Sequence, residues 1–188
     1  MQSTDSPAIE GWQRCFIALA PDAATRDALA AIAVSANARR VPYEQLHLTV
    51  TFIGALSVGQ GGALAEALTA HRIPLTPTPV THIEHWPGAA RPRLTVATLA
   101  MTDEFVKLDG HVRSLMIEQG LPVDARAFRP HITLARFARE AGAVDLATQT
   151  QTQAPVNLLA RFESLILYSS TLARHGARYQ ALASTSLR

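Results

Sequence analysis

Residues 46–53 of the chain read LHLTVTFI, and residues 131–135 read HITLA. Both stretches are rich in β-branched and other apolar residues with a two-residue alternation, which predicts β-strands. Inside them, HLTV at 47–50 and HITL at 131–134 share one pattern: histidine, apolar residue, threonine, apolar residue. Because side chains alternate between the two faces of a strand, each stretch presents one imidazole and one hydroxyl on one face and packs its apolar residues into a core on the other.

The repeated pattern supplies the groups that phosphodiester chemistry needs. If the two strands meet in a pseudo-symmetric sheet, His47, Thr49, His131 and Thr133 surround one cleft. An imidazole has an ordinary pKa near ~6.5, so it can give or take a proton at neutral pH, and a well-placed acid or base contributes about 10²–10⁴ in rate. Threonine hydroxyls can donate hydrogen bonds to the phosphate oxygens. The two motifs therefore indicate acid–base cleavage of a phosphodiester, in a scheme that needs no metal.

The segments around the two motifs predict an α+β fold with antiparallel or mixed sheets and helices on their outer faces. Asp22 and Thr102 or Asp103 are expected to cap helices, Gly54 to end the first motif strand, and Gly120 to stop a helix. The pattern predicts strands at 14–20, 46–53, 93–100, 131–135, 161–169 and 179–186, helices at 22–37, 57–70 and 103–119, an extended stretch at 73–85, and a loop with some helix at 138–153.

The composition favours one folded domain. The chain has 188 residues, of which 48% are hydrophobic and 17% charged, with a formal net charge of +2. This is enough apolar material for a core, and it excludes an intrinsically disordered chain. A net charge this small argues against a strongly charged, non-specific nucleic-acid binder. Cys15 is the only cysteine, so an internal disulfide or a cysteine-bound metal is not expected.

We do not expect a secretory signal at the start of the sequence. The first ten residues, MQSTDSPAIE, contain two acidic residues and no basic one, unlike a secretory signal, and no apolar run is long enough to cross a membrane. We expect a disordered lead-in over residues 1–12, a single domain over 13–188, and a cytoplasmic protein without membrane association.

With these motifs in view, the chain resembles the two-histidine (2H) phosphoesterase superfamily, and more closely the bacterial RNA 2′,3′-cyclic phosphodiesterases, also called 2′-5′ RNA ligase-like proteins. LHLTVTFIGAL at 46–56 and RPHITLAR at 129–136 resemble the two HxTx strands of that family. RCFIALAPDAATRDAL at 14–29 resembles its first strand and helix, and LILYSSTLARHGARYQAL at 165–182 resembles its closing pair of strands.

The resemblance implies a bilobal, pseudo-two-fold α+β fold with a central cleft and one motif in each lobe. It implies hydrolysis of 2′,3′-cyclic phosphates at RNA 3′ ends to 2′-phosphomonoesters, with no cofactor and no obligate protein partner. Carried onto this sequence, His47 is the proton donor and His131 the proton acceptor, while Thr49 and Thr133 hold the phosphate. From the residues alone the two histidines are equivalent, and either can take either role.

Two further residues are candidates for substrate contacts. Arg129 lies at the mouth of the second motif strand, where a guanidinium can pair with phosphate, and Tyr43 lies in the loop before the first motif, where a ring can stack on a base. Arg136, five residues after His131, is expected on the opposite face of a regular strand and is therefore interpreted as structural.

Two other functions remain open from the sequence. The same cleft can act on a small cyclic phosphate derived from a nucleotide instead of RNA, or the chain can be a non-catalytic module that binds RNA ends. The intact His-x-Thr pairs argue against a pure binder, because binding needs cations more than proton shuttles.

Overall fold

The computed structural model describes residues 11–70, 73–152, 156–174 and 176–187. These residues form nine strands, four α-helices and one 3₁₀ turn: β1 (Gly11–Pro21), α1 (Ala23–Ala31), β2 (Ala38–Arg40), η1 (Tyr43–Gln45), β3 (Leu48–Ser57), α2 (Val58–Ala70), β4 (Thr78–Trp86), β5 (Leu94–Leu99), α3 (Asp103–Glu118), β6 (His131–Phe137), α4 (Leu146–Thr152), β7 (Leu159–Ala160), β8 (Phe162–Ala173) and β9 (Gly176–Ser186). The expected α+β class is confirmed.

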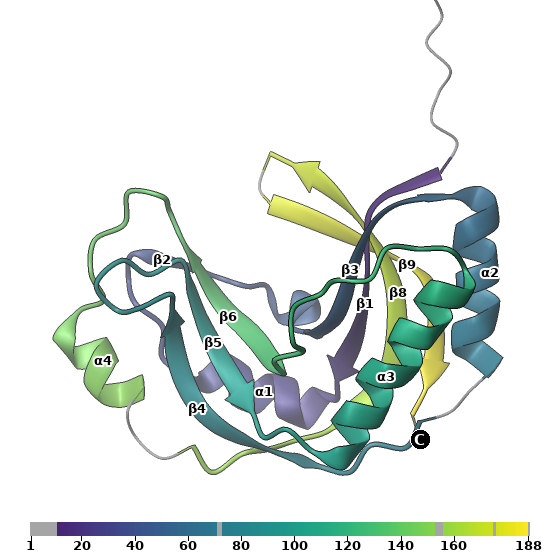
Figure 1. Cartoon of the computed structure of the whole chain (residues 1–188). Helices are drawn as coiled ribbons and strands as arrows, with labels where there is room; N and C mark the ends of the chain where they lie inside the picture. The colour runs from purple at the N-terminus through teal and green to yellow at the C-terminus, as the bar shows by residue number, and fades with distance from the viewer. Residues whose placement is uncertain (1–10, 71–72, 153–155, 175, 188) are drawn as a thin grey trace, which may run out of the picture.

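One antiparallel sheet runs through the molecule in the order β7-β4-β5-β6-β3-β1-β8-β9, and β2 also pairs with β6. Its two halves are joined at β3 and β6, where Leu48 and Ile132 are the paired residues. Figure 1 shows the halves spreading apart from this seam, with β4, β5 and β6 on one side and β1, β3, β8 and β9 on the other. Because the seam pairs the second residue of each motif, the two motifs lie side by side, one in each half.

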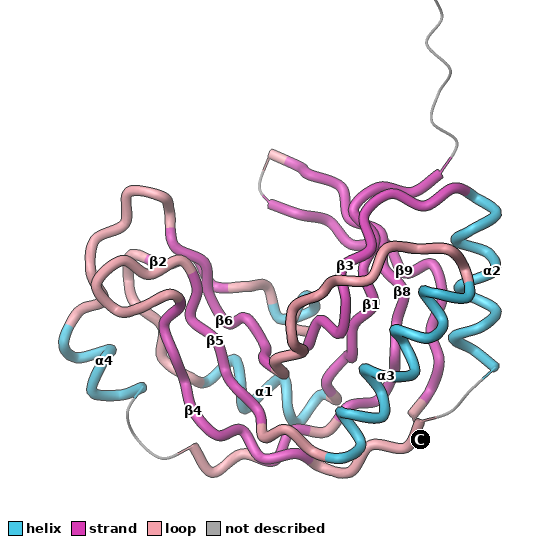
Figure 2. Tube along the Cα trace, viewed as in Figure 1, coloured by secondary structure: helices cyan, strands magenta, loops and turns pink. Residues whose placement is uncertain are grey.

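The helices lie on the outside of the sheet (Figure 2). Helix α2 packs against β9, β3, β1 and α3, and its buried leucines, Leu64 and Leu68, join the core. Asp22 caps α1 by accepting a hydrogen bond from the Thr25 N–H, and Thr102 caps α3 in the same way. Helix α1 ends at Ala31, earlier than the predicted residue 37, because the chain turns back to pair β2 with β6.

Both motif strands contain a one-residue bulge directly after the threonine. In β3, Thr49 and Thr51 pair with consecutive residues of β1, so Val50 is the extra residue. In β6, Thr133 and Ala135 pair with consecutive residues of β5, so Leu134 is the extra residue. A bulge shifts the alternation of side chains by one position, so residues beyond each bulge face the opposite way from what a regular strand predicts.

The prediction that Gly54 ends the first motif strand is wrong. Gly54 has a φ of 97° and sits opposite Cys15 in an irregular part of the ladder, and β3 continues to pair with β1 as far as Ser57. Glycine adopts this left-handed conformation without steric cost, so here it bends the strand instead of stopping it.

The expected lead-in lies almost wholly outside the described residues. Strand β1 begins at Gly11, so residues 11 and 12, the last two of the expected lead-in, are part of the sheet. In the part of the chain that the structure describes, no helix is both long enough and apolar enough to span a membrane.

Candidate active site

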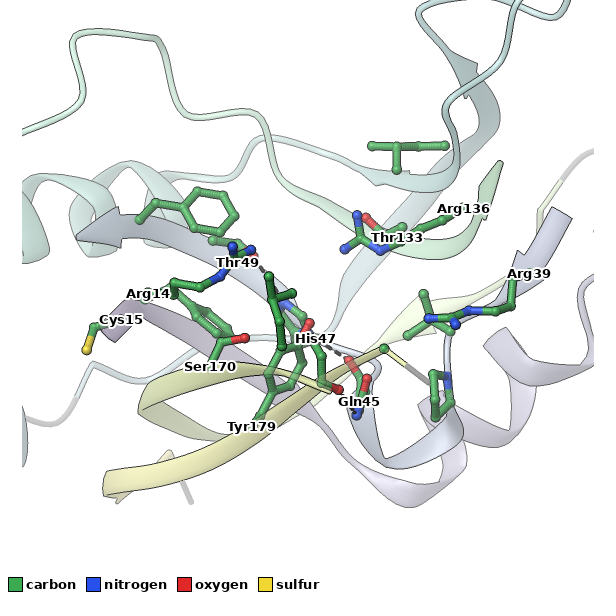
Figure 3. A pocket seen from close by; sticks show the side chains of 18 of the residues that line it. Arg14, Cys15, Arg39, Gln45, His47, Thr49, Thr133, Arg136, Ser170 and Tyr179 are labelled. Carbon is green, nitrogen blue, oxygen red and sulfur yellow. Dashed lines mark hydrogen bonds between the residues drawn. The ribbon is translucent and has the colours of Figure 1, made fainter. Parts of the chain in front are cut away.

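A cavity of about 710 Å³ lies at the seam between the two halves of the sheet (Figure 3). His47 and Thr49 line it from the start of β3, and His131 and Thr133 line it from β6. All four side chains are partly buried, whereas their apolar neighbours Leu48 and Ile132 are fully buried. The structure therefore brings the two motifs, 84 residues apart in the sequence, to one cavity.

A backbone carbonyl two residues upstream fixes the ring of His47. Its Nδ1 lies 2.7 Å from the Gln45 carbonyl oxygen, which can only accept, so Nδ1 carries the hydrogen. The other nitrogen, Nε2, lies 3.1 Å from Oγ1 of Thr49. In the neutral ring this nitrogen is an acceptor, and the threonine hydroxyl donates to it. Nε2 is thus the nitrogen that can exchange a proton with a ligand.

His131 has the same tether in the other half. Its Nδ1 donates to the carbonyl oxygen of Arg129 over 2.7 Å, which again leaves Nε2 as the proton-exchanging nitrogen. The two motifs differ at the threonine, because no hydrogen bond among the described residues joins His131 to Thr133.

Both imidazoles are held towards the neutral form. Burial lowers the pKa of His47 below its ordinary value; the nearby charges of Arg136 and His131 lower it further, and the hydrogen bond to Gln45 opposes them. Burial also lowers the pKa of His131, with the charge of Arg129 acting in the same direction and the hydrogen bond to its carbonyl opposing. An anion bound between the rings reverses these effects, since it favours the charged imidazolium.

The two bulges bring one further residue from each strand to the cavity. Phe52 and Arg136 each stand five positions after the motif histidine, and both line the cavity. The expectation that Arg136 faces away is therefore wrong. The physical cause of the observed orientation is the bulge at Leu134, which returns Arg136 to the face of His131 and Thr133. The equivalent position carries a phenyl ring in one half and a guanidinium in the other.

The charge of the cavity is strongly one-sided. Arg14, Arg39, Arg40 and Arg136 are among the residues that line it, and no aspartate or glutamate is among its described lining residues. Arg14 reaches the cavity from an irregular part of β1, where it holds a left-handed φ of 53°. Within the described ranges, no cluster of three or more His, Cys, Asp or Glu side chains is arranged to hold a metal ion. The lining is that of a site for an anion.

Aromatic rings surround His47. The ring centre of Phe16 lies 5.2 Å from that of His47, and the ring centre of Tyr179 lies 5.5 Å away, edge to face. Phe16 also stacks on Tyr168, with 5.2 Å between the ring centres, and is itself only 3% exposed. Phe16 therefore serves as a packing residue that holds the catalytic candidate in place, while Phe52, 63% exposed, offers a ring to the cavity.

Tyr43 and Arg129, the two further candidates for substrate contacts, do not line this cavity. The hydroxyl of Tyr43 donates to a carboxylate oxygen of Asp27 over 2.9 Å and thereby ties η1 to α1. The guanidinium carbon of Arg129 lies 4.3 Å from the ring centre of Trp86, which in turn lies 4.5 Å from the ring of His131. Arg129 and Trp86 line a second cavity next to the first.

Sequence reasoning missed most of the wall of the main cavity. It did not identify Arg14, Phe52, Ser170 and Tyr179 as lining residues, and they come from β1, β3, β8 and β9. Strand alternation cannot find Phe52, because the bulge at Val50 reverses the pattern before it. The repeated spacing of five after each histidine is the only sequence signal that links Phe52 to Arg136.

Known proteins share both this fold and part of the sequence. The RNA 2′,3′-cyclic phosphodiesterase of Aeropyrum pernix is 25% identical over 146 residues, which is 77% of this chain and 83% of that protein. The crystal structure of E. coli LigT complexed with 3′-AMP is 28% identical, with a TM-score of 0.71, and covers 94% of this chain and 98% of its own. A crystal structure of a Thermus thermophilus protein is 26% identical, with a TM-score of 0.73, and the match covers 93% of this chain and 98% of that protein. No protein-family model matches the chain.

These likenesses and the fold define the class of protein: the chain is a phosphoesterase of the two-histidine type. Within that class, its sequence and fold are similar to those of E. coli LigT.

Proposed function

We propose that this phosphoesterase opens 2′,3′-cyclic phosphates at RNA 3′ ends and leaves a 2′-phosphomonoester. The observation that carries the proposal is the meeting of His47 and His131 at one arginine-lined cavity, each with Nδ1 bound to a carbonyl and Nε2 left for chemistry. The Aeropyrum pernix relative is named RNA 2′,3′-cyclic phosphodiesterase, and the E. coli LigT structure is a complex with 3′-AMP, which supports the proposal.

The reaction needs one protonated and one neutral imidazole. Following the roles that the resemblance implies, Nε2 of His131 takes a proton from water as the water oxygen attacks phosphorus. The bond between phosphorus and the ribose O3′ breaks, and Nε2 of His47 donates its proton to O3′. The product is a free 3′-hydroxyl with the phosphate on O2′, and the two histidines return to their starting states by exchanging a proton with solvent.

Four cavity side chains are assigned to binding. The hydroxyls of Thr49 and Thr133 donate to the non-bridging phosphate oxygens, which gain charge in the transition state. The Arg136 guanidinium supplies a fixed positive charge beside them. Phe52 offers its exposed ring to the base of the terminal nucleotide, a contact worth about 1–3 kcal/mol in other single-strand binders.

The direct test is hydrolysis of nucleoside 2′,3′-cyclic phosphates and of a short RNA with a cyclic phosphate end, in excess chelator. We expect a 2′-phosphate product in both cases, and a loss of about 10²–10⁴ in kcat for His47→Ala and for His131→Ala. Full activity of either variant rejects the assignment. Turnover of the small substrate alone supports the small-molecule alternative, and tight binding of a 2′-phosphate without turnover supports the non-catalytic one.

A further inference from the structure

A second cavity adjoins the active-site cavity on the β4–β5 side. It has a volume of about 770 Å³, and its lining residues are Glu84, His85, Trp86, Pro87, Arg93, Leu94 and Arg129. Leu94 lines both cavities, and the ring of Trp86 contacts the ring of His131 with 4.5 Å between their centres. A ligand in the second cavity thus lies directly beside the proposed reaction centre.

The wall of this second cavity carries a stacked pair of an arginine and a tryptophan. The exposed Arg129 side chain lies over the Trp86 ring at 4.3 Å, a cation–π contact. The indole N–H of Trp86 donates to Glu84 over 2.6 Å, which fixes the plane of the ring. A guanidinium that lies over an indole leaves its outer face for stacking and its N–H groups for phosphate.

The charges around it favour an anionic chain. Two guanidiniums, those of Arg93 and Arg129, and one carboxylate, that of Glu84, are among the lining groups. Arg93 is committed to the backbone, because its Nη1 donates to the carbonyls of Ala138 and Arg139. Arg129 is therefore the group available to a ligand, and its own carbonyl accepts the hydrogen bond from His131, so this residue links the second cavity to the active site.

We propose that the second cavity binds the nucleotide that precedes the cyclic-phosphate nucleotide in an RNA chain, with its base stacked on the Arg129 guanidinium that Trp86 supports. This inference rests on the proposed function and extends it, because it makes an RNA end a better ligand than a free mononucleotide. A planar side chain can stack on any of the bases, so the site selects for chain length and not for a particular base.

The test compares the affinities of ligands that are not turned over. Calorimetric titration of the protein with a nucleoside 2′-phosphate and with a dinucleotide ending in a 2′-phosphate gives the ratio of their Kd values. We expect the dinucleotide to bind about 5- to 150-fold more tightly, the value of one stacked base. A dinucleotide that lacks the base of its first nucleotide loses most of this advantage.

Variants test whether the tighter binding of the dinucleotide comes from the second cavity. Arg129→Gln and Trp86→Leu bring the ratio close to one, whereas Trp86→Phe keeps most of it because a ring remains. The matched control is Arg91→Gln, which removes the same charge from an exposed arginine that does not line the cavity and leaves the ratio unchanged.

Equal affinities of the wild-type protein for both ligands overturn the proposal, and so does an equal loss in Arg129→Gln and Arg91→Gln. If cyclic phosphates are hydrolysed but chain length makes no difference, the second cavity is not a nucleotide site and the proposed enzyme stands. If the dinucleotide is preferred but no cyclic phosphate is opened, the nucleotide site stands and the enzyme assignment fails.

Discussion

The carbonyl oxygen two residues before each histidine decides which ring nitrogen is left to exchange a proton. Gln45 and Arg129 accept the Nδ1 hydrogens of His47 and His131 over the same 2.7 Å. This fixes the tautomer and the plane of both rings before any substrate arrives. The rings are equivalent in this respect, so the different roles that we propose for them depend on what surrounds Nε2.

At the residue scale, substrates with different leaving groups distinguish the proposed roles of the two histidines. An alkoxide needs a proton as it departs, whereas a nitrophenolate departs without one. With a cyclic phosphate, His47→Ala is expected to lose about 10²–10⁴ in kcat; with a nitrophenyl ester of a nucleotide, it is expected to lose about tenfold or less. His131→Ala is expected to lose about 10²–10⁴ on both substrates. Steady-state kinetics of the four combinations check this, and the reverse pattern exchanges the two roles.

The charge of Arg136 is predicted to tune His47. Because this guanidinium lowers the pKa of His47, Arg136→Gln raises that pKa towards the ordinary value, and the ring then stays protonated to a higher pH. Titration of the imidazole signals by NMR measures the shift. The control is Arg40→Gln, which removes the same charge from another residue of the cavity wall, one that is not among the charges acting on the pKa of His47. A His47 pKa that stays the same in Arg136→Gln contradicts the assignment.

At the element scale, two bulges set the geometry of the cavity wall, and one glycine sets the packing of α2 on β1. The bulges at Val50 and Leu134 turn Phe52 and Arg136 inward. Helix α2 packs closely on β1 because Gly61 has no side chain, and a Cβ there would overlap the Trp12 ring. The glycine lowers the helix propensity of α2 but allows the helix to cover the sheet.

Substitution of the helix glycines separates packing from helix propensity. Gly61→Ala is expected to lower the free energy of unfolding by about 1–3 kcal/mol, because the added methyl overpacks the contact. Gly62→Ala, where an added Cβ meets nothing within 4 Å, is expected to raise it by about 0.5–1 kcal/mol through helix propensity. Urea unfolding measures both. Gly61→Ala in a Trp12→Leu background should recover stability, and an equal gain from both alanines would refute the packing argument.

At the scale of the whole molecule, the sequence predicted which segments form strands and helices better than it predicted the side on which each side chain lies. The α+β class, the strands of the two motifs and the meeting of the four motif residues follow from periodicity and from the repeat, because side-chain alternation holds across the first three residues of each motif. The predicted orientation of Arg136 failed because one unpaired residue, Leu134, reverses the alternation. No local pattern marks that bulge.

Long-range pairing explains the other differences. Helix α1 is shorter than its alanine content predicts, since residues 38–40 pair with β6 instead. The second cavity was also invisible in the sequence, because Trp86 and Arg129 come together only when β4, β5 and β6 lie side by side. The sequence makes Arg129 a candidate because it adjoins the second motif, and the structure locates it at the neighbouring cavity.

The central claim is that one phosphate engages both imidazoles, and NMR titration of the histidine rings with a nucleoside 2′-phosphate tests it most directly. In the free protein both pKa values lie below the ordinary value. A bound anion favours both imidazolium forms, so we predict that both pKa values rise together and saturate at one ligand per chain. A response from only one ring, or two separate saturation points, would contradict the account.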